Sequence, residues 1–140
     1  MNIMHVILYT DGGARGNPGP AAIGCIIVDN AGNTLKEHGQ YIGQNTNNVA
    51  EYTAIIKGLE LCEHLDAKTV RVISDSELIV RQLTGKYKVR ASHLKALHDA
   101  VRTAEEAFDR VTYEHVPRSH PGTTRADTLV NEALDAQKPR

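Results

Sequence analysis

The feature that most limits the possible folds is the order of apolar segments along the chain. Three strand-like segments come first, and helices alternate with strands after them. The first three are short, rich in β-branched residues and separated by turn-forming sequences, as in an antiparallel meander. They cover Met4–Tyr9, Ala21–Val28 and Thr34–Ile42. The first ends at Asp11 and a turn-rich loop from Gly12 to Pro20.

The second part of the chain predicts helical connections between further strands. A helix from Asn48 to about Leu65 carries apolar residues at a spacing of 3.6. Strands are expected at Thr69–Ser74 and Arg110–Val116, and further helices at Ser76–Leu83, Ser92–Phe108 and Thr124–Gln137. Because helical crossovers normally join parallel strands, the order predicts an α/β fold. We expect a five-stranded mixed sheet with helices on both faces.

Length and composition favour one ordinary globular domain over residues 1–140. A chain of 140 residues is too short for two well-packed cores, and its 41% hydrophobic content is normal. The N-terminus lacks the features of a signal peptide, and no apolar run reaches the roughly 18 residues that span a membrane. Cys25 and Cys62 lack metal-ligand spacing. We therefore expect reduced thiols in a cytoplasmic protein without membrane contact.

Four carboxylates could each have a purely local role. The local roles are a turn residue (Asp11), a capping box (Asn48 with Glu51), a helix N-cap (Asp75) and a second capping box (Thr124 with Asp127). For any one of them, sequence alone does not separate this role from a functional one.

The joint placement of the four carboxylates favours a functional site. Asp11 and Asp75 follow predicted strands, at the sheet edge where α/β proteins build their sites. Glu51 and Asp127 lie near the starts of predicted helices and can project toward the same edge. Four carboxylates gathered there would repel one another without cations, and oxygen ligands suit Mg²⁺ or Mn²⁺. The pattern predicts a two-metal site acting on a phosphate group.

The charge balance agrees with a phosphate-binding protein only if these acids are metal ligands. The net charge of −1 by itself counts against nucleic-acid binding. Setting the four carboxylates aside leaves 13 acidic residues against 16 basic ones. We expect modest, salt-sensitive affinity for nucleic acid.

Four blocks of the sequence resemble the signatures of type 1 ribonuclease H, in that family's order. The blocks are Asp11–Pro20 (DGGARGNPGP), Asn47–Glu51 (NNVAE), Ser74–Ser76 (SDS), and Arg125–Asp127 with Leu129 and Asn131. Together they extend over nearly the whole chain. The resemblance implies a ribonuclease H-like fold and an endoribonuclease that hydrolyses the RNA strand of RNA–DNA hybrids, leaving a 5′-phosphate and a 3′-hydroxyl.

The resemblance also implies the catalytic and metal-binding residues. Asp11, Glu51, Asp75 and Asp127 would hold two Mg²⁺ ions, with Mn²⁺ as a substitute. His120, in the loop before the last Asp, matches a mobile catalytic His, although a solvent-exposed loop His is an equal alternative. Arg118 would contact a substrate phosphate and take over part of that role.

Substrate contacts follow from the same resemblance. Main-chain groups of Gly12, Gly13 and Ala14, with Glu51, would recognise ribose 2′-hydroxyls. Four further positions match residues that touch the two backbones, although loop and capping roles would also explain them: Asn17, Thr46, Asn47 and Asn48.

The chain departs from the family in two ways that matter here. It is a short form that lacks the long basic insertion with tryptophans, and only Lys86, Lys88 and Arg90 stand in its place, either as a partial grip or as a solvated loop. Thr123 stands where the family often has Asn.

Two other functions stay open at this point. A shortened basic grip could allow cleavage of double-stranded RNA as well, and a nucleic-acid-binding module could have kept the fold without catalysis. We expect a monomer in each case.

Overall fold

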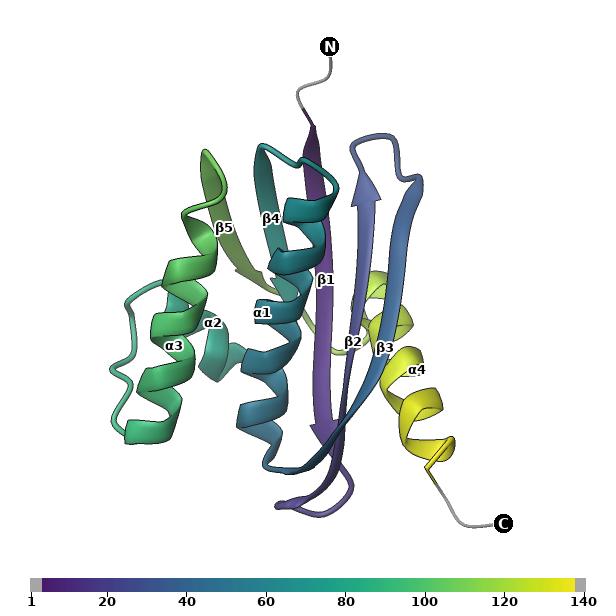
Figure 1. Cartoon of the computed structure of the whole chain (residues 1–140), viewed down its shortest axis with the longest axis vertical. Coiled ribbons are helices and arrows are strands. Elements are labelled where there is room, and N and C mark those ends of the chain that lie inside the picture. The colour runs from purple at the N-terminus through teal and green to yellow at the C-terminus, as the bar shows by residue number, and fades with distance from the viewer. Residues whose placement is uncertain (1–3, 138–140) are drawn as a thin grey trace.

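The computed structural model describes residues 4–137, and its centre is one five-stranded mixed sheet in the order β3-β2-β1-β4-β5 (Figure 1). The strands are β1 (His5–Ala14), β2 (Gly19–Asp29), β3 (Thr34–Asn45), β4 (Thr69–Ser74) and β5 (Arg110–His115). Strands β1 to β3 pair antiparallel, and β4 pairs parallel with both β1 and β5. The predicted meander and the parallel crossovers are therefore confirmed.

Helices lie on both faces of the sheet, as predicted. They are α1 (Asn47–His64), α2 (Glu77–Leu83), α3 (Ser92–Glu105) and α4 (Pro121–Asp135). Successive residues of β1 point to opposite faces. Leu8 packs under Gly58 of α1, whereas Tyr9 packs against Gly122 of α4. Helix α1 also packs on α3, while α4 contacts β1, β2 and β3 (Figure 1).

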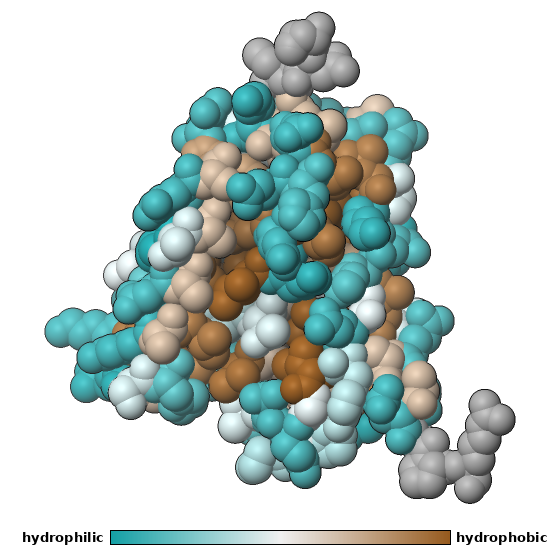
Figure 2. All heavy atoms as spheres, in the orientation of Figure 1, coloured by the Kyte–Doolittle hydropathy of each residue, from teal (hydrophilic) through white to brown (hydrophobic). Residues whose placement is uncertain are grey.

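The larger hydrophobic core lies between the sheet and the α1 layer. Its fully buried members include Leu8, Tyr52 and Leu59. Two smaller clusters lie under α4, one around Val130 and one around Ala126. Figure 2 shows the face of the molecule that carries α1 and α3, where hydrophilic residues are widespread and hydrophobic atoms are visible between them. Among the described helices, none has the length and apolarity needed to cross a membrane.

The largest difference from the predicted elements is in β1. The strand does not end at Tyr9 but continues to Ala14, because its pairing with β2 extends to the pair Ala14↔Ala21. Its pairing with β4 stops earlier, at Thr10↔Ser74. The predicted loop from 12 to 20 is therefore wrong, and only residues 15–18 connect the two strands.

The helix starts also differ from the prediction. Helix α1 is capped by Thr46, whose hydroxyl accepts a hydrogen bond from the Val49 amide at 3.2 Å. Helix α4 begins at Pro121 instead of Thr124, since proline suits the first helical position. Helix α3 ends at Glu105, three residues before the predicted end.

Candidate metal centre

Asp11 and Asp75 lie side by side where β1 and β4 separate. Asp75 directly follows β4, as predicted. The sequence predicted that Asp11 follows the end of its strand, but β1 continues past it. Asp11 is instead the first β1 residue beyond the parallel pairing with β4. Asp11 as a whole residue is 7% exposed. The two carboxylates therefore meet at the end of the parallel pairing.

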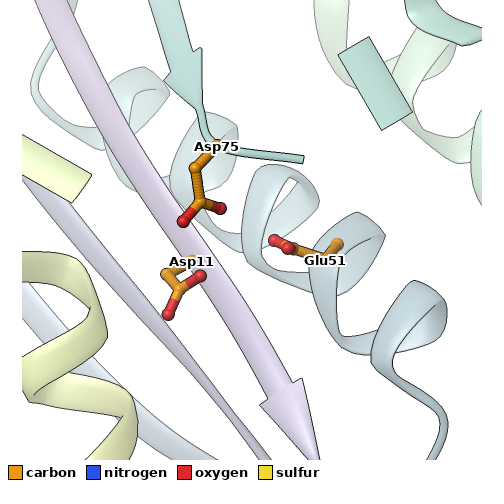
Figure 3. Close-up of side chains that lie close together, drawn as sticks. All are labelled: Asp11, Glu51 and Asp75. Atoms are coloured by element: carbon orange, nitrogen blue, oxygen red, sulfur yellow. The ribbon is translucent and has the colours of Figure 1, made fainter. Parts of the chain in front are cut away.

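Glu51 reaches the same place because α1 comes very close to β1. A Cβ atom on Gly12 would lie 2.3 Å from the carbonyl oxygen of Ala50, so only glycine fits. At this contact the main-chain N–H of Gly12 donates a hydrogen bond to Oε1 of Glu51 at 3.1 Å. One carboxylate oxygen each from Asp11, Glu51 and Asp75 lies within 4.8 Å of the others, and Figure 3 shows these side chains pointing toward one another.

Asp127 joins the cluster from the opposite face of the sheet. It is the seventh residue of α4 and lies close enough to Asp11 to raise the pKa of that carboxyl group. Its Oδ2 also accepts a hydrogen bond from Nδ2 of Asn131 at 3.2 Å. Asp127 is thus next to the group formed by the other three carboxylates.

The local roles considered for these acids are not the observed ones. Thr46 caps α1 in place of an Asn48–Glu51 box, and Ser76, not Asp75, caps α2. Asp127 lies in the second turn of α4, too far from the helix start to form a capping box. The four carboxylates are therefore placed together without a capping function to explain them.

Burial and mutual repulsion raise the pKa values of the clustered carboxyl groups. Burial, followed by the charges of Asp75 and Asp127, raises the pKa of Asp11 from 3.8 to about 8. The pKa of Glu51 is raised well above its usual range by burial and by Asp11 and Asp75. Burial also raises the pKa of Asp75, while Arg118 opposes that shift.

These groups fit a hard divalent cation. Crowded, buried carboxyl groups are unfavourable as anions unless a positive charge lies among them. All the donor atoms are oxygens, which are the ligands of Mg²⁺ and Mn²⁺. Asp11, Glu51, Asp75 and Asp127 are the residues that would hold such ions.

A cavity of about 520 Å³ opens at the carboxylates and extends toward the C-terminal half of α4. Its lining combines the acids with main chain of β1 and side chains of α4: Asp11, Gly12, Gly13, Ala14, Arg15, Asn47, Glu51, Asp75, Arg118, Asp127, Val130, Asn131 and Leu134. The four carboxylates and five of the eight predicted substrate residues thus lie in one cavity.

The remaining predicted substrate residues lie around the cavity. Asn47, which lines the cavity, links β1 to the loop that follows it. Its side-chain Oδ1 accepts a hydrogen bond from the Ala14 amide at 2.8 Å, and its main-chain N–H donates to Oδ1 of Asn17 at 3.0 Å. Thr46 caps α1, and Asn48 is half-buried in its first turn. Asn17, Thr46 and Asn48 are not among the described residues that line the cavity.

Arg118 and His120 have different environments. Arg118 lines the cavity, close enough to Asp11 and Asp75 to lower the pKa of both carboxyl groups. His120 caps α4, where its Nδ1 accepts from the Gly122 amide at 3.1 Å. Its ring centroid lies 5.6 Å from that of Tyr9. In the described chain His120 is outside the cavity lining, and its catalytic role stays a prediction.

Sequence reasoning assigned no role to two polar residues of the cavity, Arg15 and Asn131. Both belong to the signature blocks, but their contact joins residues 116 positions apart. The available signal was the spacing of Asp127 and Asn131, which places them on one face of a helix.

The chain is similar to known proteins in both sequence and structure. A family model described as reverse transcriptase-like matches residues 9–133. A bifunctional protein of Mycobacterium tuberculosis is 42% identical over 134 residues, which are 95% of this chain but only 36% of that protein. The chain thus spans about a third of the length of the first curated relatives it matches.

Two solved structures are similar over nearly their whole length. Ribonuclease H1 of Halobacterium salinarum superposes with a TM-score of 0.91 at 40% identity, covering 94% of this chain and 98% of that one. LC11 ribonuclease H1, solved in complex with an RNA/DNA hybrid, has a TM-score of 0.89 at 47% identity, covering 94% and 97%.

Proposed function

The chain belongs to the ribonuclease H family, and we propose that it is a metal-dependent endoribonuclease that hydrolyses the RNA strand of RNA–DNA hybrids. The observation that carries this proposal is the group of carboxylate oxygens from Asp11, Glu51 and Asp75, all within 4.8 Å of one another. A second support is the relative at 47% identity that was solved with an RNA/DNA hybrid.

The proposed chemistry is phosphodiester hydrolysis that leaves a 5′-phosphate and a 3′-hydroxyl. Asp11, Glu51, Asp75 and Asp127 would hold two Mg²⁺ ions, or Mn²⁺ in their place. When bound, such a pair of ions activates the attacking water and stabilises the leaving oxygen. Arg118 lines the same cavity and offers a fixed positive charge and paired N–H donors, which suit a phosphate oxygen.

Selection of RNA would depend on the 2′-hydroxyl, which is present only in ribose. The candidate contacts are on the β1 side of the cavity, where Gly13 and Ala14 lie beside Asn47. Asn47 is held by hydrogen bonds on both sides, to Ala14 and to Asn17. The Ala14 amide orients the side chain of Asn47, so little of that side chain's freedom is left to lose when it contacts the sugar–phosphate backbone.

The direct test compares end-labelled RNA–DNA hybrid, RNA duplex and DNA duplex with Mg²⁺, with Mn²⁺ and with EDTA. We expect internal cleavage of the RNA strand in the hybrid, products with 5′-phosphates, no cleavage of DNA duplex, and no activity in EDTA. Hybrid cleavage that persists in EDTA would contradict the metal mechanism. Hybrid binding without cleavage at any ion concentration would favour the non-catalytic binding module.

The RNA duplex in the same test addresses a second candidate function, cleavage of double-stranded RNA. The observation that favours it is the short connection between α2 and α3, in which Lys86, Lys88 and Arg90 are exposed. A smaller contact area on the DNA strand would place weaker demands on its sugar type. Cleavage of RNA duplex within about tenfold of the hybrid rate would support this wider specificity.

Neutralising the basic connection is expected to weaken substrate binding without slowing chemistry. In the variant Lys86→Gln/Lys88→Gln/Arg90→Gln, KM for the hybrid should rise about 5- to 20-fold at moderate salt, with kcat within twofold. Each lost phosphate contact lowers the salt dependence of binding by roughly one unit of the log–log slope, so the loss of all three should lower the slope by about 3. Steady-state kinetics at four salt concentrations give both quantities.

The matched control for this variant replaces three exposed basic residues far from the α2–α3 connection in sequence. Lys36 lies in β3, Lys68 precedes β4, and Arg110 begins β5. Their replacement by Gln changes the net charge equally. If both triple variants raised KM to the same extent, the effect would come from overall charge, and the basic connection would not be a binding element.

A further inference from the structure

Asn131 links the carboxylate of Asp127 to Arg15, which lies in the connection between β1 and β2. Nδ2 of Asn131 donates to Oδ2 of Asp127 at 3.2 Å, and Nη2 of Arg15 donates to Oδ1 of Asn131 at 3.3 Å. The guanidinium is itself held by Asp135, at 2.7 Å from Nη1. All three members of this chain of hydrogen bonds, Arg15, Asn131 and Asp127, line the cavity of the metal centre.

Arg15 and Asp127 together fix the orientation of the Asn131 amide between them. An amide side chain can present either its oxygen or its NH₂ group to a neighbour, whereas a guanidinium can only donate. Arg15 therefore requires the amide oxygen on its own side, and the NH₂ group must then point to Asp127. Without Arg15 the amide oxygen would lose the hydrogen bond that holds it, and the NH₂ group would be free to rotate away from the carboxylate.

Asp127 is held in place less firmly than Asp11 or Glu51. Asp11 is buried in β1, and Glu51 is tied to the main chain of Gly12 at 3.1 Å. Asp127 is only half-buried, on the outer helix α4, and lies outside the group of three oxygens within 4.8 Å. Groups that hydrogen-bond a metal ligand fix its orientation and commonly affect metal affinity 10- to 100-fold.

We infer that Asn131, oriented by Arg15, is a positioning residue that holds the Asp127 carboxylate ready for a divalent cation. This inference rests on the proposed function, since it concerns the same metal centre. It assigns to Asn131 and Arg15 a role that acts through Asp127 and needs no contact with substrate.

The test measures Mn²⁺ binding by isothermal titration calorimetry on the full chain without nucleic acid. Asn131→Ala is expected to weaken Mn²⁺ affinity about tenfold, with the melting temperature kept because alanine is a good helix former. Activity should fall at low Mn²⁺ and recover at high Mn²⁺, while KM for the hybrid at saturating Mn²⁺ stays within twofold. A second variant, Asn131→Ser, should give the same affinity loss.

A double-mutant cycle and a neighbouring control complete the design. Because Arg15 acts through Asn131, Arg15→Gln should weaken Mn²⁺ binding in the wild-type background and have no further effect in Asn131→Ala. The control is Glu132→Ala, an exposed residue one position along the same helix. It should bind Mn²⁺ like the wild type.

The outcomes separate this inference from the proposed function. If the wild type binds Mn²⁺ and cleaves hybrid, but Asn131→Ala has the affinity of Glu132→Ala, the positioning role is wrong and the proposed function stands. Additive losses in the cycle would overturn the part assigned to Arg15. If the wild type neither binds Mn²⁺ nor cleaves hybrid, both are overturned.

Discussion

Replacing Asp11 by Asn is expected to lower the rate of hybrid cleavage by about 1000-fold or more. Asp11 lies between the Glu51–Asp75 side of the cluster and Asp127, so it is the acid best placed to serve both cations. An amide has no negative charge and binds hard cations less well. Metal ions supply several kcal/mol of transition-state stabilisation, and a loss of about 4 kcal/mol corresponds to three powers of ten in rate.

The measurement for Asp11→Asn is single-turnover cleavage of labelled hybrid at saturating Mg²⁺. The variant should remain folded, because the substitution keeps the shape of the side chain and removes repulsion. Asp99→Asn is the matched control, since the same chemical change is made on an exposed position of α3 and should leave the rate unchanged. Wild-type rates in Asp11→Asn would show that the carboxylate cluster is not the catalytic centre.

The sequence was sufficient to predict the sheet and the identity of the acids, because both depend on local patterns. The order of segments predicts an antiparallel meander followed by parallel crossovers. Asp75 was placed correctly because β4 is a short buried strand with a clear end. Asp11 was misplaced because Gly12 and Gly13 are typical turn residues, whereas in the structure they continue β1.

What the sequence did not reveal depends on contacts between distant segments. Gly12 is needed because the main chain of α1 touches it, a constraint set 38 residues away at Ala50. The link between Arg15 and Asn131 joins the first hairpin to the last helix. His120 was interpreted as a loop residue because the sequence did not show that α4 begins at Pro121. In the structure the His120 side chain caps that helix by accepting a hydrogen bond from the Gly122 amide.

Without divalent cations, the protein is expected to become less stable as the pH rises from about 4 to about 8. The carboxyl group of Asp11 has a pKa of about 8 in the folded protein against 3.8 in the unfolded chain. Between these values the folded state holds a proton that the unfolded state has released. Raising the pH therefore favours unfolding, and the raised pKa of Glu51 acts in the same direction. At about 1.4 kcal/mol per pKa unit, the shift of Asp11 sets an upper limit of about 6 kcal/mol on this loss.

Divalent cations should reverse this loss, and more strongly at high pH, because they bind the ionised carboxylates and displace protons. At a concentration 100-fold above the dissociation constant, a cation stabilises the folded state by about 2.7 kcal/mol. Urea unfolding at pH 5, 6.5 and 8, in EDTA and in Mg²⁺, measures both effects. Asp11→Asn should flatten the pH dependence in EDTA, while Asp99→Asn should not. Equal stability at pH 5 and pH 8 in EDTA, or an equal gain from Mg²⁺ at both, would mean that the acids are not crowded and buried as described, and that no cation is needed among them.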